Sequence, residues 1–177
     1  MNKTSTLQKP SKLEDVTAKY FAATTPNSHE VQDLSTYVVC DTAYTVDGKT
    51  VVLDYTPQEK EIAELLEREL GGEIFMVPRV NHPPGISTPD YLFRGERFDL
   101  KRLFGRGKNT LYDAVAKKAS QSENFILDLT HCPLEEAEIK RQIMLIYSST
   151  HTRFVDTIIV VRDGAISRIL KKATKQS

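Results

Sequence analysis

The sequence predicts an α/β (α+β) fold, a mixed β-sheet flanked by helices, with an N-terminal helix and β-hairpin. From residue 57 onward, segments with helical spacing of apolar residues alternate with short runs typical of strands. Two Asp-Gly pairs, at 47–48 and 163–164, are typical of β-hairpin turns. Of the 177 residues, 40% are hydrophobic, which is enough for one sizeable core. With 27% charged residues, the composition is that of an ordinary globular protein. It excludes collagen-like and wholly disordered chains.

The first fifty residues predict one helix and one hairpin strand. Apolar residues at helical spacing favour a helix over 11–23, followed by a loop over 24–35. Residues 37–46 and 50–55 favour a hairpin that turns at 47–49.

Residues 57–70 carry the clearest helix signal. Thr56-Pro57 is a favourable start and Gly71-Gly72 a favourable end for a helix. The apolar residues inside it recur at helical spacing and predict a buried stripe, made of Ile62, Leu65, Leu66 and Leu70.

The rest of the chain alternates strands and helices. We expect a strand at 73–77, a loop at 78–88, a hairpin at 89–101, a helix at 109–120, a strand at 125–129, a helix at 133–147 and a hairpin formed by 157–161 and 165–170. A domain boundary is expected near residue 50, with 1–50 as an N-terminal appendage and 51–177 as the main domain.

The formal net charge of zero conceals two oppositely charged segments. Residues 54–73 hold seven acidic and two basic residues, whereas residues 79–118 hold nine basic and four acidic ones. A neutral protein can still bind a polyanion if its fold gathers the basic residues on one side; solvated faces of opposite sign are the alternative. The two cysteines lie 92 residues apart and indicate a reducing compartment. Neither a membrane-spanning run nor a signal peptide is expected.

The hairpin at 89–101 brings chemically useful side chains together. A two-residue loop beginning with Gly95 suits a type II′ turn. Asp90 then lies opposite Lys101, and the alternation of side chains places Asp99 on the same face. The intervening apolar residues point to the other face, into the core.

Two carboxylates and an ammonium on one face suit metal-assisted phosphodiester hydrolysis. Mg²⁺ prefers oxygen ligands and is often held by one or two carboxylates together with substrate phosphate. A bound metal ion lowers the pKa of water and stabilises charge on the scissile phosphate, and a nearby lysine can orient the water. The simpler alternative is an exposed ion pair of little energetic value.

The order of elements around this hairpin resembles the PD-(D/E)XK phosphodiesterase superfamily: acidic helix, strand, Pro-Asp, Asp-x-Lys, helix, strand. More narrowly, residues 58–170 resemble the tRNA-cleaving C-terminal toxin domains of contact-dependent growth inhibition proteins, the CdiA C-terminal type. The motifs that carry this resemblance are EKEIAELL, GGEIFMVPRVN, STPDYLF, ERFDLKR and NFILDL. The resemblance implies a nuclease-like central mixed sheet.

The resemblance also implies roles for individual residues. Asp90 and Asp99 would be metal ligands and Lys101 the catalytic lysine, although Glu is more usual than Asp at position 99. A glutamate of the preceding helix would complete the site, and Glu61 is our choice. The rivals on the same helix are Glu59 and Glu64. The expected cofactor is Mg²⁺, with Zn²⁺ or Mn²⁺ as alternatives.

The implied function is that of an endonuclease toxin that cleaves RNA, most plausibly tRNA. The expected phosphate contacts are Arg102, Lys108, Lys117 and Lys118. The implied protein partner is a cognate immunity protein. Action in the bacterial cytoplasm is implied, after delivery from another cell as part of a larger secreted protein.

Three alternatives stay open at this point. The chain could be a DNA endonuclease of the same superfamily, or a non-catalytic nucleic-acid-binding or phage structural module. A metal-independent ribonuclease would use a pair of histidines, such as His131 and His151. Four aromatic residues could also stack on bases, although a core or hairpin role is favoured for most of them: Tyr91, Phe93, Phe104 and Tyr112. The basic loop 105–108 either contacts phosphate or is a linker.

Overall fold

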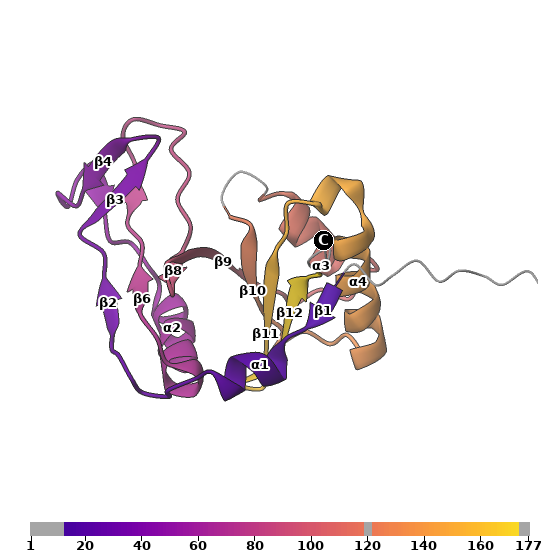
Figure 1. Ribbon diagram of the computed structural model, residues 1–177. Coiled ribbons are helices and arrows are strands. Elements are labelled where there is room, and N and C mark those ends of the chain that lie inside the picture. The colour runs from indigo at the N-terminus through magenta and orange to yellow at the C-terminus, as the bar shows by residue number, and fades with distance from the viewer. Residues whose placement is uncertain (1–12, 119–121, 174–177) are drawn as a thin grey trace, which may run out of the picture.

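The computed structural model describes residues 13–118 and 122–173 (Figure 1). The described part of the chain forms one large mixed sheet of eight strands, in the order β1-β12-β11-β10-β9-β8-β6-β2. Strands β9, β10 and β11 run parallel to one another, as do β2 and β6, and the other neighbours are antiparallel. The predicted class, a mixed sheet with flanking helices, is confirmed.

Two small sheets and four α-helices complete the described structure. The strands are β1 (Leu13–Asp15), β2 (Val31–Asp33), β3 (Thr36–Val39), β4 (Thr42–Thr45), β5 (Val51–Val52), β6 (Ile74–Met76), β7 (Arg79–Val80), β8 (Tyr91–Phe93), β9 (Glu96–Arg102), β10 (Asn124–Asp128), β11 (Thr157–Arg162) and β12 (Ala165–Lys172). The helices are α1 (Thr17–Ala22), α2 (Pro57–Leu70), α3 (Thr110–Ala116), α4 (Glu136–Ser148) and the 3₁₀ helix η1 (Thr150–Thr152). None of the helices in the described ranges is long and apolar enough to cross a bilayer.

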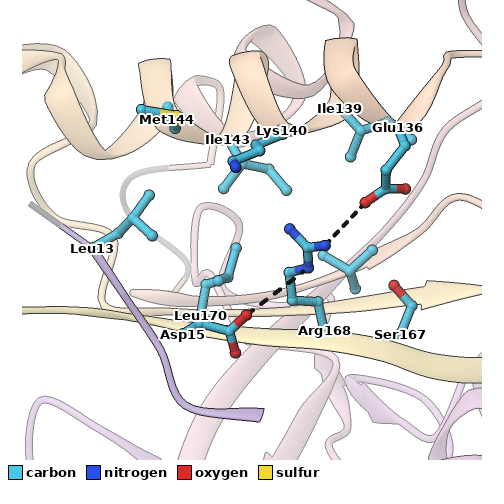
Figure 2. Close-up of a pocket in the computed structure, with 11 residues that line it drawn as sticks. Leu13, Asp15, Glu136, Ile139, Lys140, Ile143, Met144, Ser167, Arg168 and Leu170 are labelled. Carbon is cyan, nitrogen blue, oxygen red and sulfur yellow. Dashed lines mark ion pairs between the residues drawn. The ribbon is translucent and has the colours of Figure 1, made fainter. Parts of the chain in front are cut away.

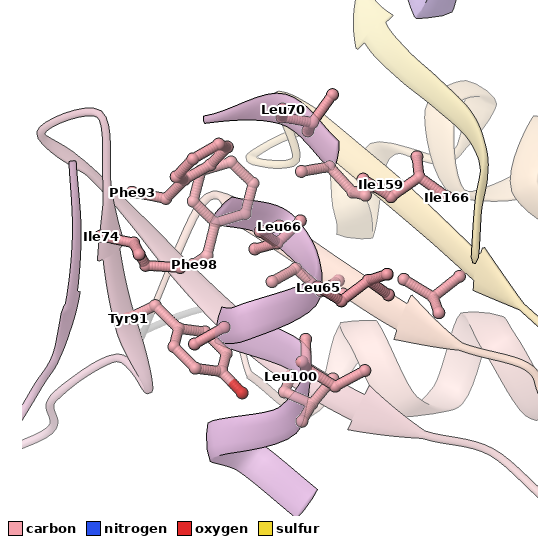
Figure 3. Packing of buried hydrophobic residues seen from close by; sticks show 14 of the residues in the cluster. Leu65, Leu66, Leu70, Ile74, Tyr91, Phe93, Phe98, Leu100, Ile159 and Ile166 are labelled. Atoms are coloured by element: carbon pink, nitrogen blue, oxygen red, sulfur yellow. The ribbon is translucent and has the colours of Figure 1, made fainter. Parts of the chain in front are cut away.

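Alternating side chains of the central strands build a core on each face of the sheet. In β10, Ile126 packs in the cluster beneath α2, while Phe125 and Leu127 pack in the cluster beneath α3 and α4. Figure 3 shows the first cluster, in which leucines of α2 meet aromatic side chains of the β8–β9 hairpin. Every residue of β10 is buried, as expected for a parallel strand covered on both faces.

Helix α2 begins and ends where the sequence predicts. Thr56 and Glu59 form a capping box: the Thr56 side chain accepts from the Glu59 N–H, and the Glu59 carboxylate accepts from the Thr56 N–H. Gly71 ends the helix with φ = 65°, and a Cβ there would lie 1.9 Å from the Thr25 carbonyl oxygen. The predicted stripe faces the core.

The N-terminal predictions are wrong in part. Instead of one helix over 11–23, the described residues form strand β1 and the short helix α1, because β1 pairs with β12 and the Asp15 carboxylate accepts from the Thr17 N–H. The predicted hairpin around 47–49 is replaced by β3–β4, which turns at Cys40 and Asp41. The Asp47 carboxylate instead closes a local loop by accepting backbone N–H groups, and β5 pairs with β7.

Strands from residues 13–33 form both outer strands of the large sheet. β1 pairs with β12 at one edge and β2 with β6 at the other (Figure 1). Part of the predicted N-terminal appendage is therefore part of the large sheet.

The later elements agree with the sequence in kind, with shifted ends. The β8–β9 and β11–β12 hairpins, strands β6 and β10 and helix α4 all lie within or beside their predicted ranges. Helix α3 ends at Ala116, and the last part of the predicted helix, over 119–120, lies outside the described residues.

Candidate active site

The pairing of β8 with β9 is shifted by two residues from the predicted register. Phe93 pairs with Glu96, so the loop is Arg94-Gly95, and both loop residues have positive φ, of 52° and 78°. The Arg94 side chain explains the difference, because its guanidinium donates to the Leu70 carbonyl 2.8 Å away and lies over the Phe93 ring. Asp90 therefore lies beside Phe98, to whose carbonyl its N–H donates, and not opposite Lys101.

The shift preserves the alternation of side chains, and the structure brings Asp90, Asp99 and Lys101 into one pocket. The pocket has a volume of about 430 Å³ and mostly polar walls. One wall comes from β9, another from β7 and the loop before β8, and Lys118 adds a second ammonium after α3. Phe98 and Leu100 point the other way and lie in the core, as predicted.

Asp99 and Lys101 form a buried ion pair. The Lys101 Nζ lies 2.5 Å from Asp99 Oδ2, and the two side chains are only 16% and 4% exposed. Although this ion pair is close, Asp99 Oδ2 makes no hydrogen bond of good geometry with any described residue. A buried carboxylate oxygen in this state retains capacity for a further ligand.

Asp90 is the most strongly perturbed acid of the pocket. Burial and, next to it, the neighbouring charge of Asp99 together raise its pKa to about 7, with a smaller contribution from Glu59. The Leu100 N–H, which donates to Asp90 Oδ2 at 2.7 Å, acts in the opposite direction. Two close carboxylates against one ammonium leave a local excess of negative charge, which favours a bound cation.

The helix glutamate at this pocket is Glu59, and the structure does not bring Glu61 there. Glu61 and Glu64 line a different pocket of about 190 Å³. Glu59 is the third residue of α2, and its position follows from the capping box. Its Oε1 lies 3.4 Å from Arg79, so this carboxylate already has two partners. Glu59 therefore replaces Glu61 as the candidate third acid.

The donor set fits a hard divalent cation. Within the described ranges, no three His, Cys, Asp or Glu side chains converge into a closed metal centre. Two carboxylates, one of them with a buried oxygen that lacks a hydrogen bond, match the way Mg²⁺ is held together with substrate phosphate. Because the donors are oxygens alone, they favour Mg²⁺ or Mn²⁺ over Zn²⁺.

Only one of the four predicted phosphate contacts, Lys118, lines this pocket. Arg102 follows Lys101 in β9 and therefore points to the opposite face, where its Nε lies 3.1 Å from Asp128. Lys117 is exposed after α3, and the Lys108 carbonyl is held by Arg141 of α4.

The pocket also contains Arg79, which sequence reasoning missed. Arg79 lies in the pocket because β7 pairs with β5, and no local sequence pattern predicts that pairing. Its guanidinium lies 3.4 Å from Glu59 and 3.9 Å from Asp54, so both ion pairs are loose. Half of the side chain is exposed, which leaves donors for a phosphate.

The histidine alternative receives no support from the geometry. His131 precedes α4 and His151 follows it, in η1. A helix of 13 residues, about 20 Å long, separates the two histidines along the chain. His131 instead stacks against Phe104.

A groove of about 350 Å³ lies between α4 and the β1–β12 edge of the sheet (Figure 2). Its walls are mostly aliphatic, and Met144 is half exposed there. Two cationic side chains, Lys140 and Arg168, line the groove, and Arg168 is paired with Asp15 and Glu136. Such a surface suits apolar contacts better than phosphate chemistry.

Comparisons with known proteins give one family and one solved structure. Residues 87–166 match the family described as the contact-dependent growth inhibition CdiA C-terminal domain. The match covers less than half of the chain, includes Asp90, Asp99 and Lys101, and leaves α2 outside. No curated protein matches the sequence.

The solved structure is described as the CdiA-CT/CdiI toxin and immunity complex from Burkholderia pseudomallei. A chain of that complex is similar to this one with a TM-score of 0.52 and 20% identity, over 81% of this chain and 100% of the other. At this identity the likeness concerns the fold, and the residues of the candidate site have to be argued from their own geometry.

Proposed function

We propose that this chain is a metal-dependent nuclease that cleaves RNA, with tRNA as the favoured substrate, and that it serves as a toxin domain in contact-dependent growth inhibition. The observation that carries the proposal is the pocket that joins Asp90, Asp99 and Lys101 within the segment matched by the CdiA C-terminal family. The preference for tRNA rests on the resemblance of the sequence to tRNA-cleaving toxin domains of that type.

Each residue of the pocket has a chemical role in this proposal. Asp90 and Asp99 would hold Mg²⁺ or Mn²⁺, which when bound lowers the pKa of water and stabilises negative charge on the scissile phosphate. Lys101, oriented by Asp99, donates hydrogen bonds to a phosphate oxygen and offsets its charge. Arg79 and Lys118 bind neighbouring phosphates from two walls of the pocket. Glu59 orients Arg79 through their ion pair.

The partner and the place of action follow from the same proposal. The similar solved structure contains a toxin and an immunity protein, and we infer that this chain has an immunity protein of its own. As a toxin domain it would reach the cytoplasm of a target bacterium as part of a longer protein. The inhibitor would protect the producing cell by blocking substrate access.

The decisive experiment is cleavage of tRNA and of plasmid DNA by the purified chain, with Mg²⁺ and with EDTA. Asp90→Asn should abolish cleavage, whereas Asp163→Asn, an exposed change in the β11–β12 turn, should leave it intact. Cleavage that survives both EDTA and Asp90→Asn would refute the proposed site. Cleavage of plasmid alone would retain the site and change the substrate to DNA.

A further inference from the structure

One aromatic side chain near the candidate site is displayed on the surface. Phe104, two residues after β9, is 59% exposed, whereas Tyr91 and Phe93 are fully buried. Tyr112 is half buried, and its hydroxyl lies 3.0 Å from that of Ser149. Of the four aromatic residues that the sequence offered as base contacts, Phe104 is therefore the one that is mostly exposed to solvent.

Phe104 belongs to a stack and is not an isolated exposed side chain. The His131 ring lies parallel to it, with 6.0 Å between centroids and 5° between planes. The Arg102 guanidinium carbon lies 5.8 Å from the Phe104 centroid and is fixed by its ion pair with Asp128. His131 and Arg102 fix the orientation of the phenyl ring. Stacking of a flat ligand on this ring therefore costs little additional side-chain entropy.

The two loops that carry the stack are fastened together. Phe104 follows β9 and His131 follows β10, and these strands are parallel neighbours in which Arg102 is paired with Asp128. The Leu103 N–H donates to the Asp128 carbonyl at 3.1 Å, and the Cys132 Sγ lies 3.6 Å from the Gly105 carbonyl oxygen. The stack thus lies at the carboxyl ends of parallel strands, where open sheets commonly bind ligands.

Two further cationic residues follow the exposed ring in the chain. Arg106 and Lys108 follow it in the same loop, and both are exposed. The loop is anchored to α4, because Gln142 donates to the Gly107 carbonyl at 2.9 Å and Arg141 donates to the Lys108 carbonyl. An aromatic ring flanked by cations is the combination that binds single-stranded nucleic acid, through base stacking and phosphate contacts.

The stack follows the candidate site along the chain, although Arg102 and His131 line the pocket on the other face of the sheet. Lys101 and Phe104 are three residues apart, so their Cα atoms are separated by at most about 11 Å. We propose that Phe104 and His131, with Arg102, form a stacking site for an unpaired nucleobase of the RNA substrate, while Arg106 and Lys108 contact its phosphates. This inference rests on the proposed function for the identity of the ligand as RNA.

A tryptophan reporter tests the stacking directly. The chain has no tryptophan, so Phe104→Trp supplies a single tryptophan, whose emission can be excited apart from that of the tyrosines. In an Asp90→Asn background, which keeps the RNA intact, titration with tRNA and with a single-stranded RNA oligonucleotide should quench this fluorescence. Phe21→Trp, at a 40% exposed position on α1, is the matched control and should not be quenched.

A truncation measures what the ring contributes. In the same Asp90→Asn background, Phe104→Ala should weaken RNA binding about 5- to 150-fold, with an unchanged salt dependence. Arg106→Ala should instead reduce the slope of binding against salt by about one. Circular dichroism confirms that each variant is folded.

The outcomes separate this inference from the proposed function. RNA that binds without quenching Trp at position 104, RNA that binds Phe104→Ala as tightly as the parent, or an absence of RNA binding would each overturn the stacking site. Quenching together with a loss of affinity in Phe104→Ala supports it. If quenching occurs but the unmutated chain cleaves no nucleic acid, the proposed nuclease function fails while the stacking site stands.

Discussion

The residues of the candidate site are ionisable groups held away from water. A carboxylate loses solvation when it is buried, so it ionises only where a cation or hydrogen-bond donors compensate it. Asp99 has Lys101 as its compensating cation, whereas Asp90 has the Leu100 N–H and two acidic neighbours. The two aspartates therefore differ in chemistry, although both lie in one pocket.

Asp90 should make the stability of the metal-free protein depend on pH. Its pKa is raised to about 7 from 3.8, so the folded state binds this proton more tightly than the unfolded state does. The stabilisation is complete below about pH 4 and is lost as pH rises through about 7. Because Asp90→Asn mimics the protonated form, its free energy of unfolding should exceed that of the parent increasingly between pH 4 and pH 8. Urea unfolding in EDTA, followed by circular dichroism, measures the difference.

The same titration with Asp163→Asn provides the control for a carboxyl group at the surface. Its stability should follow that of the parent at every pH. Parallel pH profiles for Asp90→Asn and the parent would show that Asp90 is not perturbed in the folded state.

Removing Lys101 should be costly because it leaves Asp99 buried without its ion-pair partner. Lys101→Met should lower the free energy of unfolding by about 3 kcal/mol, near the lower end for a buried pair because the lysine retains some solvent contact. Asp99→Asn combined with Lys101→Met should recover most of that loss. Urea unfolding of the single and double variants measures both effects.

An exposed ion pair offers a matched comparison. Lys19 lies 2.6 Å from Glu14, but both side chains are exposed, so Lys19→Met should change stability by less than about 0.5 kcal/mol. Equal effects of Lys19→Met and Lys101→Met would contradict the view that burial sets the energy of the Asp99–Lys101 pair.

At the scale of elements, helix α2 connects local sequence signals to the site. Its capping box fixes Glu59 at the rim of the pocket, and the Tyr91 hydroxyl donates to the Glu59 carbonyl at 2.7 Å. Both ends of the helix were predictable because Thr56-Pro57 at its start and Gly71 at its end act locally. Glu61 lies in a different pocket, because periodicity identifies the apolar stripe of a helix but not which polar residue meets a distant strand.

Thr56→Ala tests the contribution of this cap. The change removes the hydroxyl that accepts from the Glu59 N–H, and it should destabilise the protein by about 1 kcal/mol. Thr56→Ser keeps the acceptor and should be close to neutral. Denaturant midpoints at constant m-value report the difference. An alanine variant as stable as the serine variant would mean that the capping box contributes nothing measurable.

Hairpins show where element-level prediction fails. The β11–β12 hairpin turns at Asp163-Gly164 as predicted, because both its strands and its turn are local. The Asp47-Gly48 pair predicted a hairpin turn that does not form. The Asp47 carboxylate closes a local loop instead, and β5 pairs with β7, almost thirty residues away. In the β8–β9 hairpin the register was wrong but the shared face was right, because a shift of two residues preserves alternation.

At the scale of the whole molecule, the sheet joins parts of the chain that the sequence separates. The class and the central strands could be predicted from alternating patterns, but both edges come from residues before position 34, paired with strands far along the chain. The pocket lies between β9 and β7. Its shape therefore depends on the pairing of β7 with β5, which is distant from it in the sequence. This explains why Arg79 escaped prediction and why Glu59 was only one of three candidate glutamates, whereas the Pro-Asp and Asp-x-Lys residues of one hairpin could be predicted.

A truncation tests whether residues 51–177 fold alone, as the sequence predicted. Removal of residues 1–50 strips the pairing partners from β12 and β6 and removes Val16, Tyr20 and Val31 from the core beneath α2. It would also expose two new sheet edges to intermolecular pairing. We expect residues 51–177 to unfold at a much lower urea concentration and with lower cooperativity than the full chain. A chain of residues 13–177 keeps every described strand and should unfold like the full chain. If residues 51–177 unfold cooperatively with an unchanged midpoint, they form an autonomous domain and the edge strands are accessory to it.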